Sequence, residues 1–521
     1  MIKLKKFLYN TINIVTVVLF TWIVSLLVIA YYVNFKCKKA FLAGNITLLI
    51  VGSIGLVIII VIAEKIKNQY RQFLGNLCKA LPVIAIVFCA LQIWICYNIF
   101  FETGWDSGAF VIPASKALLN GENIQSFNEK YFVYCPNNVF LVNIYWGILK
   151  INEILHIFKG EYQLMAIVCV NCILSSFSCW LVYLITRKRL SDGIAVLTYF
   201  MALILVGFSP WMVICYSDSL TIFLPIFIIY LYSQKRLKSN FKWPLIFVLG
   251  YLGYCIKPQA LIVVVAILVI EILHYIGNVN RQMLIKTAGI FVISFVLIAV
   301  ISSGVNKVYL KEGFDVKSEK SVGLTHYFMM GLNKDTNGVY AEEDVILSRS
   351  CETKKERMKT NLEVAGERIK AMGPKGYFKF LSKKMLTNYD DGTFGWGAEG
   401  NFYMKVSELP DKRVASLLRA FYYNDGKYFS IYSTLVQCAW SIVVIACWIQ
   451  MIWICRGKVR ENKEYMVMSL ALIGLTIFEL LFEARARYLY IYVPVYVLVF
   501  GYGIKNIINR CIFITKTRNE I

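Results

Sequence analysis

Long apolar runs, separated by short polar segments, repeat along nearly the whole chain. A helix that crosses a membrane needs about 20 mostly apolar residues, and twelve runs approach or reach this length. We therefore predict an all-α polytopic membrane protein with about twelve transmembrane helices. The runs are 9–33, 41–63, 80–101, 164–186, 193–209, 212–232, 243–256, 258–278, 284–305, 430–455, 464–482 and 487–508.

The break at Lys257-Pro258 separates two short runs. A proline disfavours helical backbone at the residue before it. We interpret 243–278 as a tight hairpin of two spans, with one long kinked helix as the alternative.

Another apolar run, at 139–157, is amphipathic. If this run crossed the membrane, the basic segment 187–189 would lie outside. The following loops, up to the long segment 306–429, would also change sides. We therefore predict a helix that lies at the outer membrane interface. A thirteenth span is the alternative. The polar residues of this run include Asn143, Lys150, Asn152, Glu153 and His156.

Two long polar segments, 102–140 and 306–429, follow the third and ninth spans. The second is long enough for a small domain, with a break at Pro374-Lys375-Gly376. It is predicted to form one large, mainly helical extracytoplasmic loop domain. The chain then divides into a two-helix N-terminal addition (1–79), a transmembrane core (80–305), the loop domain (306–429) and C-terminal helices with a tail (430–521).

Composition supports this class and the charge gives it an orientation. Apolar residues make up 58% and charged residues 17%, against roughly a quarter charged in soluble domains. This excludes a disordered chain, a soluble enzyme and a disulfide-rich secreted module. The net charge of +23 would suggest nucleic acid in a soluble protein.

Here the basic residues gather in the short loops that would all be cytoplasmic if the N-terminus is cytoplasmic. We predict a multi-pass cell membrane protein with both termini in the cytoplasm and no nucleic-acid partner. The outer loop with Lys36, Lys38 and Lys39 is an exception.

Several kinds of site are missing from the sequence pattern. The three histidines, His156, His274 and His326, are far apart and lack zinc-ligand spacing. No phosphate-binding glycine loop or dinucleotide fingerprint occurs. We predict no metal site and no certain cofactor.

The first outer loop offers a candidate general base. Glu102 to Gly108 follow the third span directly, and Asp106 stands between Trp105 and Gly108, which favours a tight turn. There it would meet both a lipid-borne substrate and an acceptor from water. An ordinary solvated aspartate is the alternative.

More ionisable residues lie at the outer ends of other spans: Asp218, Lys257, Arg485 and Arg487. Charges at a membrane edge are costly and point to function. The acids suit proton abstraction and the bases suit a phosphate. The alternative is that these charged side chains only extend from the membrane edge into water and have no role in function.

This arrangement resembles the polytopic glycosyltransferases of the GT-C fold, which use polyprenyl-phosphate-linked sugars. The closest resemblance is to bacterial mannosyltransferase-like proteins, related to protein O-mannosyltransferases and aminoarabinose transferases. The acidic first loop followed by helix 139–157 matches that layout, and six stretches occur in a similar order. They are 131–138, 216–218, 257–258, 325–333, 388–394 and 483–488.

The resemblance implies inverting transfer from a polyprenyl-phosphate sugar to a cell-wall or surface glycan, or a protein. Asp106 would be the general base, and Lys257, Arg485 and Arg487 would bind the donor phosphate. Asp218 would orient the acceptor, with a divalent metal ion there as an open alternative. Other acceptor-binding or site-shaping candidates are Glu102, Tyr134, Asn137, Asn138, His326, Asp390 and Asp391.

The chain departs from the family pattern in two places. Glu102 and Asp106 are four residues apart, whereas many relatives carry adjacent or nearly adjacent acids, so a second catalytic acid stays open. Cys135-Pro136-Asn137-Asn138 stands where His-Pro-Pro is expected.

Two other functions remain as alternatives. A transporter or flippase of lipid-linked saccharides predicts internal repeats and broken helices near the midplane. A polysaccharide polymerase or ligase predicts chemistry on arginine-rich loops instead of a first-loop acid.

Overall fold

The computed structural model describes residues 2–29, 41–276, 280–399, 403–405, 412–457 and 462–519. Within these ranges almost all regular structure is helical, which confirms the predicted fold class. The two strands, β1 (Phe101–Thr103) and β2 (Tyr403–Lys405), form one antiparallel pair. The basic exception at 36–39 lies outside the described residues.

The predicted spans coincide with helices or with pairs of short consecutive helices. In the part of the chain that the structure describes, seven helices are long and apolar enough to cross a membrane, and three apolar helices are shorter. A polytopic membrane protein is therefore confirmed, and twelve crossings stay a prediction. The helices at these spans are α1 (Ile2–Ile29), α2 (Asn45–Gln69), α3 (Arg71–Asn98), α7 (Met165–Arg189), α8 (Asp192–Ala202), α9 (Ser217–Thr221), α10 (Leu224–Ser233), α11 (Ser239–Ile256), α12 (Ile262–Tyr275), α13 (Arg281–Glu312), α19 (Phe429–Cys455), α20 (Lys463–Leu481), α21 (Arg487–Tyr490) and α22 (Val493–Asn519).

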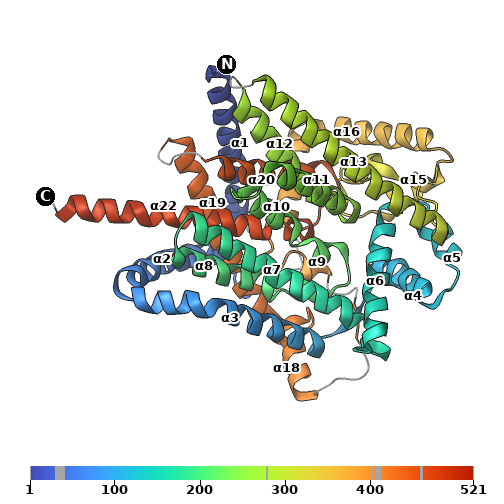
Figure 1. Ribbon diagram of the computed structural model, residues 1–521, viewed down its shortest axis with the longest axis horizontal. Helices are drawn as coiled ribbons and strands as arrows, with labels where there is room; N and C mark the ends of the chain where they lie inside the picture. The colour runs from blue at the N-terminus through green and yellow to red at the C-terminus, as the bar shows by residue number, and fades with distance from the viewer. Residues whose placement is uncertain are drawn as a thin grey trace.

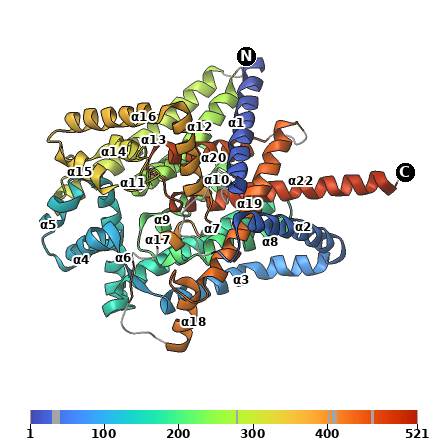
Figure 2. The same ribbon diagram turned by 180° about the vertical axis from the view of Figure 1, so that it is seen from behind.

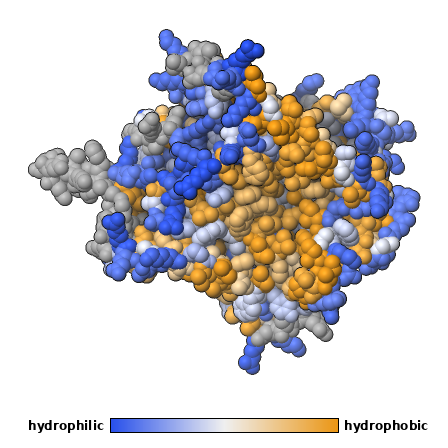
Figure 3. Space-filling model, in the orientation of Figure 1, coloured by the Kyte–Doolittle hydropathy of each residue, from blue (hydrophilic) through white to orange (hydrophobic). Residues whose placement is uncertain are grey.

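An apolar band crosses the middle of the face seen in Figure 3, between hydrophilic margins on both sides. Helices α3, α7 and α22 run along the long axis of the molecule in Figures 1 and 2. One hydrophilic margin lies over α4, α5 and α15. This is the surface of a helix bundle that sits in a bilayer with polar ends. The elements at this margin and around it are α4 (Ile112–Asn120), α5 (Gln125–Phe127), α6 (Val139–Leu155), α14 (Gly323–Met330), α15 (Glu342–Ser350), α16 (Lys354–Tyr389), α17 (Trp396–Glu399) and α18 (Lys412–Tyr422).

The chain breaks at Lys257-Pro258 into two helices, as the sequence predicts, and two membrane crossings there stay a prediction. Lys257 has extended backbone (φ −152°, ψ 114°) and ends α11. The two helices pack closely, because a Cβ at Gly250 of α11 would lie 2.7 Å from Val264 Cγ2 of α12. A Cβ at Gly253 would lie 2.9 Å from the Cβ of Ala260 in the short turn between them. Such close packing requires glycine at this position.

The amphipathic helix at 139–157 is α6, which ends at Leu155, before His156 in the left-handed conformation (φ 52°). Val142, Tyr145 and Leu149 are buried, whereas Ile151 and Ile154 are exposed. Figures 1 and 2 show α6 running across the end of α7 and not alongside it. This placement suits an interfacial helix, and its position in the membrane stays a prediction.

Helix α16 connects the large outer segment to the bundle. Its two halves meet at Gly373 (φ 58°) and Pro374, where the sequence predicted a break. At the end of the second half, the hydroxyl of Tyr389 lies 2.6 Å from Thr476 Oγ1 and 2.7 Å from the hydroxyl of Tyr496. Tyr389 therefore packs among α20 and α22. The division of the chain at 79, 305 and 429 stays a prediction.

Candidate active site

A strained turn presents Asp106 immediately after α3 and β1. Trp105 adopts the left-handed conformation (φ 55°), which is unfavourable for a residue with a Cβ. A Cβ at Gly108 would lie 1.9 Å from the carbonyl oxygen of Thr103, so only glycine fits there. The tight turn predicted from the sequence is present, and it holds the carboxylate at the start of a short π-helix, Ser107–Val111.

The carboxylate of Asp106 accepts hydrogen bonds from side chains of three separate segments. The Tyr131 hydroxyl donates to Oδ2 at 2.6 Å, and the Tyr216 hydroxyl lies 2.9 Å from Oδ1 and 3.0 Å from Oδ2. Asn138 Nδ2 lies 3.5 Å from Oδ2 and donates to the Tyr131 hydroxyl at 2.6 Å. Burial and the charge of Asp106 raise the pKa of Tyr131, so this phenol remains a donor. The carboxylate is thus held in one orientation.

Two arginines at the start of α21, Arg485 just before it and Arg487 as its first residue, lie over aromatic rings of the same site. The guanidinium carbon of Arg487 is 4.6 Å from the ring centre of Trp105 and 4.8 Å from that of Tyr216. Arg487 is only 5% exposed. Arg485 Nε donates to Glu483 Oε1 at 2.8 Å. Positive charge is therefore held next to Asp106, at a distance set by the Tyr216 side chain.

A buried ion pair completes the cluster. Lys257 and Asp218 are in contact, with exposed fractions of 4% and 0%. The ammonium of Lys257 lies 4.4 Å from the ring centre of Tyr488, whose hydroxyl donates to Glu483 Oε2 at 3.0 Å. Asp218 Oδ2 has no hydrogen-bond partner. The structure thus brings Asp106, Asn138, Asp218, Lys257, Arg485 and Arg487 together.

Lys384 fixes the segment that carries the two arginines. Its ammonium donates to the carbonyl oxygens of Gly331, Leu480 and Phe482 at 2.6, 2.8 and 2.7 Å. These three bonds use all three of its hydrogens. The end of α20 and the chain beyond it are therefore anchored to α16, which links the outer segment to Arg485 and Arg487.

Other predicted residues lie elsewhere. Glu102 is in β1, opposite Met404, and Asn137 donates to Asn138 Oδ1 at the surface. Tyr134 packs under Arg349, 4.6 Å from its guanidinium carbon. Asp391 accepts from Thr393 and from the backbone N–H of Gly395, so its oxygens stabilise their own turn. Asp390 is buried beside this turn.

His326 is buried between α14 and α15, where its Nδ1 lies 2.8 Å from Ser348 Oγ. Burial lowers its pKa to about 4. Because the folded protein keeps this histidine neutral while the unfolded chain protonates it near pH 6.5, stability should fall as the pH drops from about 6.5 to 4. The full effect is about 3 kcal/mol. Unfolding of the full chain measured at pH 7.5, 5.5 and 4.5 tests this, with His326→Gln expected to flatten the dependence.

The sequence analysis missed Tyr131 and Tyr216 as partners of Asp106. Both belong to stretches on which the resemblance rests, but their hydroxyl direction depends on tertiary structure. Trp105 and Tyr488 were missed as well. One signal in the sequence could have identified Trp105 and Tyr488. Each is an aromatic residue directly beside a charged one, as in Trp105-Asp106 and Arg487-Tyr488.

Comparison with known proteins gives the family. A family model described as "conserved hypothetical integral membrane protein" matches residues 4–507. The chain belongs to this family. A membrane location follows, whereas the orientation of the termini stays a prediction. No curated protein matches the sequence.

One solved structure is similar to this chain over much of the chain's length. It is the crystal structure of ArnT from Cupriavidus metallidurans bound to undecaprenyl phosphate, with 12% identity, 82% of this chain and 77% of that chain covered, and a TM-score of 0.27. ArnT is a GT-C aminoarabinose transferase, a class that the sequence resemblance names.

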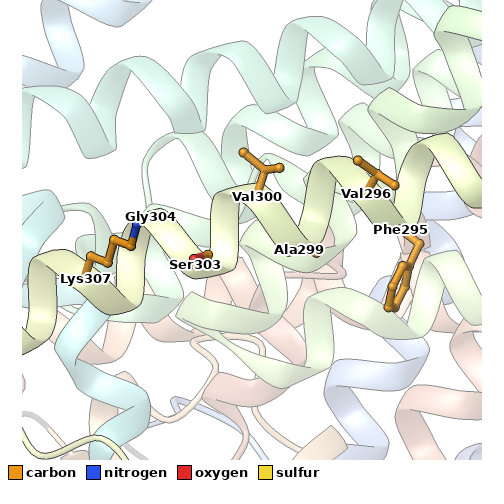
Figure 4. A pocket seen from close by; sticks show the side chains of 7 residues that line it. All are labelled: Phe295, Val296, Ala299, Val300, Ser303, Gly304 and Lys307. Atoms are coloured by element: carbon orange, nitrogen blue, oxygen red, sulfur yellow. The ribbon is translucent and has the colours of Figure 1, made fainter.

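Two cavities differ in chemistry. A groove of about 540 Å³ runs along α13 alone, from Phe295 to Lys307 (Figure 4). Its lining is mostly apolar, as expected for a helix that faces lipid. A polar pocket of about 440 Å³ lies between residues 121–129 and 311–313. Neither is lined by Asp106.

Proposed function

We propose that this protein is a membrane glycosyltransferase that moves a sugar from a polyprenyl-phosphate donor to an extracytoplasmic glycan or protein, with inversion at the sugar. The observation that carries the proposal is the pairing of one oriented carboxylate, Asp106, with buried cations around Trp105 and Tyr488. Transfer of this kind needs a base on the acceptor side and positive charge on the leaving-group side.

The acceptor step is assigned to Asp106. Its carboxylate takes the proton of the acceptor hydroxyl while that oxygen forms a bond to the anomeric carbon. Tyr131 and Tyr216 hold the carboxylate in place by donating to it. General-base catalysis of this type contributes roughly 10²- to 10⁴-fold in rate.

The donor step is assigned to the cations. The bond between the anomeric carbon and the phosphate oxygen breaks, and its electron pair stays on the lipid phosphate. Arg487, Arg485 and Lys257 would stabilise this charge, because buried and oriented cations act strongly where water is excluded. The guanidinium carbons of Arg485 and Arg487 lie 5.7 and 4.6 Å from the ring centre of Trp105. Trp105 directly precedes Asp106, so the proposed donor-binding and acceptor-activating groups are neighbours.

The direct test is transfer of radiolabelled sugar in membranes that contain the full chain and are supplied with polyprenyl-phosphate sugars. We expect a labelled extracytoplasmic product with at least one donor. Absence of product with every donor would contradict the proposal. Reporter fusions at both termini test the proposed orientation, and the reporters are expected to face the cytoplasm.

The Tyr131→Phe variant should slow transfer by roughly 10- to 100-fold, because a hydrogen bond to a charged group contributes about 1.5–3 kcal/mol. Initial rates at saturating donor check this. The matched control is Tyr254→Phe, since Tyr254 lies on α11 and is 50% exposed. Equal rates for Tyr131→Phe and wild type would show that this phenol does not orient the base.

A further inference from the structure

The polar pocket lies where two helices end, at one edge of the molecule. Its walls are residues 121–125 and 128–129, from the first outer segment, and residues 311–313. Helices α4 and α5 and the C-terminal end of α13 meet there in Figures 1 and 2. Its volume of about 440 Å³ falls within the roughly 300–1,000 Å³ typical of small-molecule sites.

The pocket is acidic, although the chain as a whole is strongly basic. Three glutamates and one lysine line it, Glu122, Glu129, Glu312 and Lys311. Each glutamate uses one oxygen to fix its own position: Glu122 with Asn120 at 2.8 Å, Glu129 with Gln125 at 2.8 Å, and Glu312 with Asn143 at 3.1 Å. The second oxygen of each carboxylate is left for a ligand.

The helix ends add to this negative potential. α4 ends at Gly121 (φ 71°) and α13 at Gly313 (φ 91°). The C-terminus of a helix carries a partial negative charge. Two such ends and three carboxylates favour a ligand that brings positive charge and hydrogen-bond donors. Among the residues that the structure describes, no three His, Cys, Asp or Glu are grouped to hold a metal ion.

Two short paths connect the pocket to Asp106. Asn128 lines the pocket and shares the π-helix Asn128–Phe132 with Tyr131, which donates to Asp106. Asn143, the partner of Glu312, is five residues from Asn138 along the chain, a rise of about 7.5 Å in a helix. A ligand in the pocket is thus next to the elements that hold the base.

We propose that this pocket binds an amine-bearing sugar unit of the acceptor and so guides an acceptor hydroxyl to Asp106. The assignment rests on the proposed transferase function for its role, but not for its chemistry. Protonated amines meet the carboxylates, and hydroxyl groups meet the free oxygens and the amides of Asn123 and Asn128. Glycans that carry carboxylates or phosphates are repelled by the same charges.

The test is calorimetric binding to the full chain in lipid nanodiscs, without donor and at low salt. The probes are the trimers of glucosamine, N-acetylglucosamine and galacturonic acid, and trilysine. We expect the glucosamine trimer to bind best and the galacturonic acid trimer not to bind. The double variant Glu129→Gln/Glu312→Gln should weaken glucosamine binding at least tenfold, and each single variant less. Glu153→Gln, an exposed residue of α6 paired with Lys150, is the matched control and should bind as the wild type does.

Three results would overturn the assignment: no binding of the glucosamine trimer, equal binding of the acidic trimer, or unchanged binding in all glutamate variants. Binding of trilysine alone would show a basic peptide site instead. Asp106→Asn should keep glucosamine binding while it loses transfer. If the wild-type chain binds this trimer but transfers no sugar from any donor, that result contradicts the proposed function and leaves the chemistry of the pocket standing.

Discussion

The Asp106→Asn variant is expected to reach the membrane as the wild type does and to lose sugar transfer by roughly 10²- to 10⁴-fold. An amide has nearly the same shape as the carboxylate, so the turn at Trp105 keeps its conformation. It has no basic oxygen to accept the acceptor proton, however. The hydroxyls of Tyr131 and Tyr216 can rotate to accept from the new amide, which limits structural damage.

This prediction is checked by initial transfer rates, with protein amount and thermal stability measured in parallel. Asp335→Asn, an exposed aspartate of the outer segment, is the control and should keep its activity. Full activity of Asp106→Asn would contradict the role of Asp106. If Asp106→Asn keeps full transfer activity and Arg485→Ala loses it, the arginine-based chemistry of a polymerase or ligase is favoured.

The second large effect is expected at the buried pair of Asp218 and Lys257. Removing one partner leaves an uncompensated charge in the interior, at a cost of about 3–5 kcal/mol. Asp218→Asn and Lys257→Met should therefore each lower the midpoint of thermal unfolding. The double variant leaves no unpaired charge and should recover most of the lost stability.

Activity separates the two roles of this pair. If Lys257 also binds the donor phosphate, the stable double variant has a raised KM for the donor, whereas its unfolding midpoint is near that of the wild type. If the double variant has both an unfolding midpoint and a donor KM near those of the wild type, the pair has a structural role only. No recovery of stability would show that the two charges do not compensate each other. The exposed pair Arg187–Asp192, with a contact of 2.9 Å, is the matched control and should contribute about 0–1 kcal/mol.

Apolar runs predicted the helices of the bundle well because their length and burial depend on local composition. The run at 430–455 became α19 (Phe429–Cys455), and 464–482 became α20 (Lys463–Leu481). The break at Lys257-Pro258 was also predictable, since proline acts on the preceding residue directly.

The site was predictable only in part. The sequence indicates at which end of a helix Asp218, Lys257 and Arg487 lie, but not how each helix is rotated in the bundle. Contacts between these residues therefore could not be derived. The turn of Asp391 shows the same limit, because its oxygens bond to Thr393 and Gly395 although its spacing resembles a site motif.

The position of α1 has a consequence for how the protein is made. Thr21 accepts from Trp448 Nε1 at 2.9 Å, across 427 positions of the sequence, and Trp22 stacks on Phe378 with ring centres 5.4 Å apart. Helix α1 therefore meets these neighbours only after α16 and α19 have been synthesised. A chain that stops before α19 leaves Thr21 of α1 without its hydrogen bond to Trp448, so the final packing of α1 depends on segments that are made much later.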